Sequence, residues 1–134
     1  MAKNKNKVKG SSLERKIAID LREKYPFVKT CRESSRLLDN CKVDLSGVPF
    51  AIQAKAGYNG QRLRYDRLYQ EFKQLASENF SPNHPIHKVP YILINKLNRV
   101  KGGKMQQPEM FQVTVDYDFF LKLIRNYESE HAEI

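Results

Sequence analysis

Polar side chains interrupt an otherwise apolar, strand-like stretch at residues 43–55, VDLSGVPFAIQAK. Asp44 lies near the start of this stretch, and Gln53 and Lys55 lie two residues apart at its end. Burying such groups is unfavourable unless a partner satisfies them. Carboxylate and amide oxygens can ligate a hard divalent cation, and a lysine can stabilise negative charge on a phosphate. The sequence therefore raises the question of which partner satisfies these polar groups.

Two neighbouring strands are predicted to bring these side chains together. Apolar and polar positions alternate within residues 48–56, which places Gln53 and Lys55 side by side on one face. Residues 41–47 also have strand character, and the short connection containing Gly and Pro predicts a β-hairpin. In a suitable register Asp44 points to the same face. Alternatively, this face is solvated, and Asp44 and Lys55 form an ordinary ion pair worth about 0.2–1 kcal/mol.

A first helix is predicted for residues 10–26, where apolar residues recur at helical spacing between a glycine and a proline. Glu14 lies near its start and has two interpretations. With Ser11 three positions earlier, it forms a capping box that satisfies backbone donors at the helix start. Alternatively, it is a carboxylate near the end of a helix that lies across the sheet.

The order of the predicted elements indicates the α/β class, with a mixed β-sheet flanked by helices. Besides the first helix, we expect strands at residues 27–31, 41–47, 48–56, 88–96 and 110–117, and helices at residues 64–79 and 118–128. Asp116 or Asp118 is the expected cap of the last helix. The aromatic residues expected in the core are Phe72, Phe111, Phe119 and Phe120.

Length and charge indicate one domain with an anionic partner. The 134 residues suffice for a single core, which we place at residues 10–127 between a basic disordered tail at 1–9 and an acidic tail at 128–134. The net charge of +9 favours a nucleic acid as partner. The longest apolar run is far shorter than the about 20 residues that cross a bilayer. Cys31 and Cys41 do not suggest a disulfide framework, so we expect a cytoplasmic protein.

Three short motifs together resemble the PD-(D/E)xK nuclease superfamily. They are Gly10-x3-Glu14, Val43-Asp44 and Gln53-x-Lys55, and within the superfamily the chain looks most like the small Holliday junction resolvases of archaea, bacteria and phages. The resemblance covers residues 10–95 and implies a restriction-endonuclease-like αβββαβ core. It also implies a magnesium ion, for which manganese can substitute, and a homodimer that cuts two strands symmetrically.

Each motif residue has a role implied by this resemblance. Asp44 would be the principal magnesium ligand, Glu14 a further acidic residue at the metal, and Lys55 the group that orients the attacking water. Gln53 stands where an acid is usual, and its neutral oxygen should bind a cation more weakly than a carboxylate. The same Gln-x-Lys pattern resembles the variant in Mrr-like restriction nucleases. Val43 replaces the proline of the motif name, a change that the superfamily often shows.

Three basic segments are candidates for contacts with DNA. The segment CRESSR resembles the serine and basic residues that precede the strand aspartate in archaeal resolvases, although a solvated loop is an equal alternative. Two later loops carry arginines and lysines, which position a duplex through its phosphates. The candidate DNA-binding residues are Arg32, Ser34, Ser35, Arg36, Arg62, Arg64, Arg67, Lys101 and Lys104.

The leading hypothesis is a magnesium-dependent, structure-selective DNA endonuclease that resembles Holliday junction resolvases and hydrolyses phosphodiester bonds at branched DNA. A compact nuclease of this size would suit a phage acting in the host cytoplasm. A second hypothesis is a restriction-like, Mrr-type nuclease that cuts duplex DNA. A third is a non-catalytic basic protein that binds nucleic acid, in which Asp44 and Lys55 only pair with each other.

Overall fold

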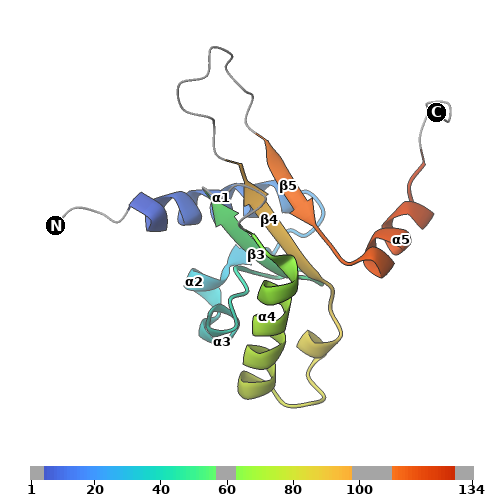
Figure 1. Ribbon diagram of the computed structural model, residues 1–134. Coiled ribbons are helices and arrows are strands. Elements are labelled where there is room, and N and C mark those ends of the chain that lie inside the picture. The colour runs from blue at the N-terminus through green and yellow to red at the C-terminus, as the bar shows by residue number, and fades with distance from the viewer. Residues whose placement is uncertain (1–4, 57–62, 98–109, 129–134) are drawn as a thin grey trace, which may run out of the picture.

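A mixed three-stranded sheet forms the centre of the fold (Figure 1). The computed structural model describes residues 5–56, 63–97 and 110–128, and side chains from residue 11 onward. The central strand β4 (Tyr91–Lys96) pairs in parallel with β3 (Ala51–Ala56) and antiparallel with β5 (Phe111–Thr114). This confirms an α/β fold with a mixed sheet.

Helices pack on both faces of the sheet because apolar side chains alternate along the strands. Helix α1 (Lys5–Leu21) buries Leu13 and Ile17 in a cluster that includes Ile52 of β3. Helix α4 (Tyr65–Asn79) packs Phe72 against the ring of Tyr91 on the other face. Burying each large apolar side chain contributes roughly 1.5–3 kcal/mol, so the two helices fix the sheet between them.

Helix α1 begins at Lys5, five residues before the start that the sequence predicts. A glycine inside a helix costs only about 1 kcal/mol, and Gly10 does not stop this one. Residues 5–9, which were expected in the tail, therefore lie within α1. Ser11 is not at the helix start, so the predicted capping box with Glu14 is wrong. Glu14 instead lies in the middle of a helix that packs on the sheet.

The segment between α1 and β3 forms a second, smaller unit. Strand β1 (Lys29–Thr30) pairs antiparallel with β2 (Leu45–Ser46), and both are shorter than predicted. Between them lie helices α2 (Cys31–Ser34) and α3 (Arg36–Asn40), where the sequence allowed a solvated loop. The hydroxyl of Ser35 accepts a hydrogen bond from the backbone N–H of Leu38 and caps α3.

The predicted hairpin between residues 41–47 and 48–56 is wrong, since β2 pairs with β1 and β3 pairs with β4. The backbone N–H of Asp44 donates to the carbonyl of Ile52 at 2.8 Å. The Asp44 carboxylate then takes the place of a backbone acceptor, because its Oδ2 accepts from the N–H of Ala54 at 2.7 Å. Asp44 thus joins the small unit to the edge of the main sheet.

The turn from β2 to β3 requires a glycine at position 47. Gly47 has a φ of +82°, which favours glycine, and a Cβ there would lie 2.6 Å from the carbonyl oxygen of Phe27. The backbone of the turn therefore lies close to the backbone of Phe27, which precedes β1, with no room for a side chain between them.

Helix α5 (Tyr117–Arg125) follows β5 and extends away from the sheet (Figure 1). The carboxylate of Asp116 caps it by accepting from the N–H of Asp118 at 3.0 Å, which confirms one of the two predicted caps.

Phe119 packs edge-on against Phe50, with ring centroids 5.8 Å apart. Phe120 was expected in the core but is 47% exposed, so that prediction is wrong. A further 3-10 turn, η2, spans Pro85–His87.

Candidate active site

Asp44 lies at the edge of β3 in a partly buried position between the two sheets. Burial raises the pKa of its carboxyl to about 7, and the negative charge of Glu14 acts in the same direction. The hydrogen bond from Ala54 and the positive charges of Lys55 and Arg32 act against this rise. A substantial fraction of Asp44 is therefore protonated at neutral pH unless a divalent metal ion binds to the carboxylate.

Glu14 presents a second carboxylate from α1 and is only 3% exposed. The guanidinium of Arg32 donates to Oε1 of Glu14 at 3.2 Å. The other oxygen, Oε2, is buried and accepts no hydrogen bond from the residues that the structure describes. Burial raises the pKa of Glu14, whereas the charge of Arg32 lowers it. An orphaned buried acceptor costs about 1–3 kcal/mol, and a bound cation is one way to remove that cost.

Gln53 is buried on β3 and held by a tyrosine from the neighbouring strand. The hydroxyl of Tyr91 donates to Oε1 of Gln53, and the hydroxyl of Tyr65 donates to the backbone carbonyl of Tyr91 at 2.9 Å. Burial raises the pKa of Tyr91, so this hydroxyl stays a donor. An amide oxygen has two lone pairs, so Gln53 keeps one acceptor position for a further partner.

Asn95 lies beside Lys55, because the two residues are paired in the parallel register of β3 and β4. Its side chain is only 2% exposed, and within the described segments its Nδ2 has no hydrogen-bond partner. The sequence indicated no functional role for Asn95 or Tyr91, because residues 88–96 were expected only to form a strand. Their spacing of four residues places them on one face, which was the available signal.

The structure places Glu14, Lys55 and Arg32 near enough to Asp44 for the charge of each to affect the pKa of the Asp44 carboxyl. Gln53 lies two residues from Lys55 on the same strand face. Carboxylate and amide oxygens are the donors that hard cations prefer, so Glu14, Asp44 and Gln53 fit a magnesium ion chemically. No group of three His, Cys, Asp or Glu side chains in the described parts of the chain is placed to hold a metal.

The CRESSR residues have structural partners that the sequence did not indicate. Arg32 binds Glu14, as described above. The hydroxyl of Ser34 donates to the carbonyl of Thr30 at 2.9 Å and lies 2.7 Å from the Ser46 hydroxyl. Ser35 caps α3. Arg36 is exposed at the start of α3.

The other basic candidates lie beyond β3. Arg64 precedes α4 and forms an exposed ion pair with Asp66 at 2.8 Å, which contributes little to stability. Arg67 is exposed on the first turn of α4. Arg62, Lys101 and Lys104 lie outside the described residues.

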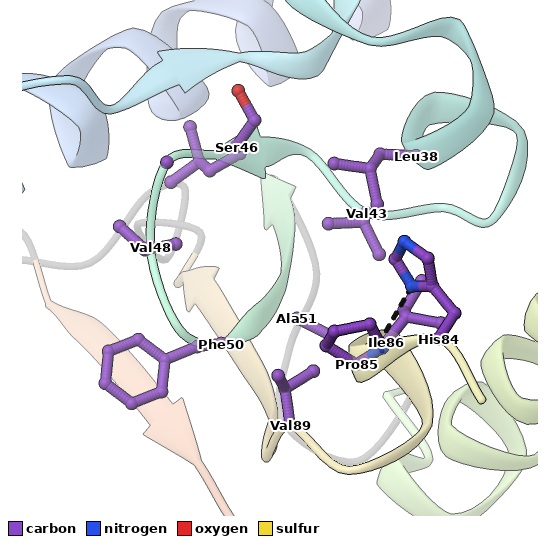
Figure 2. Close-up of a pocket in the computed structure, with 12 residues that line it drawn as sticks. Leu38, Val43, Ser46, Val48, Phe50, Ala51, His84, Pro85, Ile86 and Val89 are labelled. Carbon is purple, nitrogen blue, oxygen red and sulfur yellow. Dashed lines mark hydrogen bonds between the residues drawn. The ribbon is translucent and has the colours of Figure 1, made fainter.

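An apolar cavity of about 180 Å³ lies against residues 43–48, the stretch that includes Asp44 (Figure 2). It is enclosed by the turn before β3 and by η2, and Val43 and Leu45, the neighbours of Asp44, both line it. Its one titratable side chain, His84, uses Nδ1 to accept from the N–H of Ile86 at 3.1 Å. This cavity therefore belongs to the packing that holds Asp44, and the polar chemistry lies on the other side of the segment.

Comparison of the chain with protein-family models, with characterised proteins and with solved structures finds no match. Among the helices that the structure describes, none is both long and apolar enough to cross a membrane. The functional argument therefore rests on the residues of the site.

Proposed function

We propose that this chain is a metal-dependent DNA endonuclease of the PD-(D/E)xK kind, selective for branched DNA in the manner of Holliday junction resolvases. The observation that carries the proposal is the pair of partly and fully buried carboxylates, Asp44 and Glu14, beside the cations Lys55 and Arg32. The negative charge of Glu14 raises the pKa of Asp44, and a bound divalent cation would stabilise both carboxylates in their charged form. The proposal includes a restriction-endonuclease-like αβββαβ core built on the mixed sheet.

Asp44 and Glu14 would hold magnesium, with Gln53 as a neutral third ligand. When bound, the ion would polarise the phosphate and lower the pKa of a coordinated water. Asp44 would lose its proton when the cation binds, because the pKa of about 7 reflects burial and the charge of Glu14. Arg32 would keep the Glu14 carboxylate oriented through Oε1, which leaves Oε2 for the ion.

Lys55 would orient the attacking water and stabilise the charge that builds up on the phosphate. Its influence on the pKa of Asp44 supports a position next to the metal ligands. Tyr91 would hold the Gln53 side chain in one orientation. Because Gln53 brings no charge, we expect weak affinity for magnesium, and we expect manganese to support cleavage as well.

The positive charge of the chain supports a nucleic acid as substrate. Arg36 and Arg67 are exposed and suit contacts with phosphates, as do Arg62, Lys101 and Lys104 in the segments that the structure does not describe.

Symmetric cleavage of two strands would require two active sites, so the proposed enzyme would act as a homodimer. Its proposed setting is the cytoplasm, including that of a phage-infected host.

Cleavage of a labelled four-way junction, next to a linear duplex of the same sequence, tests the proposal. Purified protein with magnesium should make paired symmetric nicks in the junction, and chelation of the metal should abolish them. Asp44→Asn and Lys55→Met should each bind the junction but lower the cleavage rate by at least about 100-fold, as expected when charge stabilisation is lost. Asp20→Asn removes an exposed carboxylate of α1 and is the matched control that should cleave normally.

The Gln-x-Lys pattern favours one second candidate, the Mrr-like nucleases. Equal cleavage of junction and duplex would favour this class over a resolvase. Binding of either substrate without cleavage, in magnesium and in manganese, would contradict both nuclease proposals and leave a basic protein that only binds nucleic acid.

A further inference from the structure

Helix α5 exposes a set of apolar side chains that no described residue covers. These side chains have exposed fractions between 46% and 73% and form what we call the α5 surface: Tyr117, Phe120, Leu123, Ile124 and Tyr127. They recur at spacings of three, four and seven residues, so they lie along one side of the helix and its C-terminal end. None of them carries a charge.

The opposite side of α5 faces the rest of the chain. Asp118, Phe119 and Lys122 line a cavity together with Tyr65 and Tyr69 of α4. Two of the three charged residues of α5, although exposed, thus lie on the side next to α4, and the α5 surface lies on the other side. An amphipathic helix ordinarily buries its apolar side against its own core, so this orientation indicates that another apolar surface covers it.

The exposed area supplies more than half of what a stable contact between two chains buries on each partner. A fully exposed aromatic side chain offers about 150–250 Å², so the five residues together expose on the order of 500 Å² per chain. A stable interface buries about 800 Å² on each partner, and the aromatic residues and the lack of charge suit its centre.

The order of residues on the α5 surface fits a second copy of the same chain. It is nearly symmetrical about position 122, because Tyr117 and Tyr127 lie five residues to either side and Phe120 and Ile124 lie two residues to either side. Two antiparallel copies would therefore place aromatic against aromatic at both ends and Phe120 against Ile124 in between. Such self-complementarity is what a two-fold contact requires.

We propose that two copies of this chain associate through their α5 surfaces in an antiparallel, two-fold symmetric dimer. A nucleic acid is a poor occupant for this surface, since phosphates are bound by cations. This inference deepens the proposed function by naming the dimer contact, yet it stands on the exposed residues of α5 and does not require nuclease activity.

Sedimentation equilibrium of the full chain tests the inference. Wild type should have twice the chain mass of 15.7 kDa at micromolar concentration. Ile124→Glu places two like charges near the symmetry axis and should weaken the dimer at least about 100-fold, to the mass of a single chain. Ile19→Glu is the matched control, because Ile19 is a 63% exposed isoleucine on α1, far from α5 in sequence, and this variant should remain dimeric. Circular dichroism should show that both variants are folded.

A cysteine at the symmetry axis locates the contact directly. Leu123→Cys should form a disulfide between two chains under mild oxidation, whereas Ile19→Cys should not, and the native Cys31 and Cys41 are buried. A monomeric wild type at about 100 µM, or an Ile124→Glu variant that stays dimeric, would overturn the inference. Junction cleavage is measured on the same proteins. A dimer that does not cleave would support this inference and contradict the proposed nuclease activity. A monomer that cleaves would contradict this inference and support the nuclease activity.

Discussion

Asp44 should make the folded chain less stable as the pH rises from about 4 to about 7 in the absence of divalent cations. Burial, together with the charge of Glu14, raises its pKa to about 7, from an ordinary value of 3.8. Between these two values the unfolded chain has released the proton and the folded chain still holds it. The folded state binds more protons there, so its stability falls with rising pH and levels off above about pH 7.

The size of this effect follows from the same two values. They differ by about three pH units, and each unit corresponds to about 1.4 kcal/mol, so the loss approaches about 4 kcal/mol. Asp44→Asn removes the charge and keeps a side-chain oxygen that can accept from the N–H of Ala54. We therefore expect the variant to be up to about 4 kcal/mol more stable than wild type at pH 8, and nearly equal to it at pH 4.

Urea unfolding followed by far-ultraviolet circular dichroism, from pH 4 to pH 8.5 in a metal chelator, measures this difference. Asp20→Asn, which removes an exposed carboxylate, should follow the wild-type curve at every pH. If wild type and Asp44→Asn instead show parallel curves, the Asp44 carboxyl is not held protonated by burial, and the reasoning is refuted.

Three further outcomes follow from the site. Magnesium at 100 times its dissociation constant should stabilise wild type by about 2.7 kcal/mol at pH 8 and Asp44→Asn far less, and equal thermal shifts would contradict metal binding at Asp44. Tyr91→Phe frees the Gln53 oxygen and should cost about 1 kcal/mol in urea unfolding while slowing junction cleavage, so an unchanged cleavage rate would exclude a role for Tyr91 in positioning Gln53. Asn95→Leu removes a buried amide whose Nδ2 has no hydrogen-bond partner among the described residues and should raise stability by about 1 kcal/mol, whereas lower stability would reveal a partner for that amide.

Local patterns were sufficient to predict most of the regular elements. The alternation in residues 51–56 and the apolar run in 91–96 are both realised as paired strands. The apolar side of α4 is buried as its periodicity predicts, and Asp116 caps α5. These features depend on neighbours within a few residues, which is the range over which sequence patterns carry information.

Pairing over long distances in the chain could not be predicted in the same way. The hairpin was wrong because β2 pairs with β1, which lies fifteen residues earlier in the chain, and β3 pairs with β4, which lies forty residues later. Tyr91 and Asn95 were missed because they reach the site only through the parallel pairing of β3 with β4, some forty residues further along the chain. The surplus apolar side of α5 is visible in the sequence, but its outward orientation depends on how the helix docks.

The Asp44 side chain also protects an exposed edge strand of the main sheet. In the order β3-β4-β5, β3 is an edge strand, and an edge strand with unpaired N–H groups is a template onto which another chain can add. The carboxylate occupies the N–H of Ala54 and so blocks such addition. Asp44→Ala would leave this N–H unpaired and invite aggregation, in addition to removing the charge. Asparagine is therefore the substitution that separates loss of chemistry from exposure of the sheet edge.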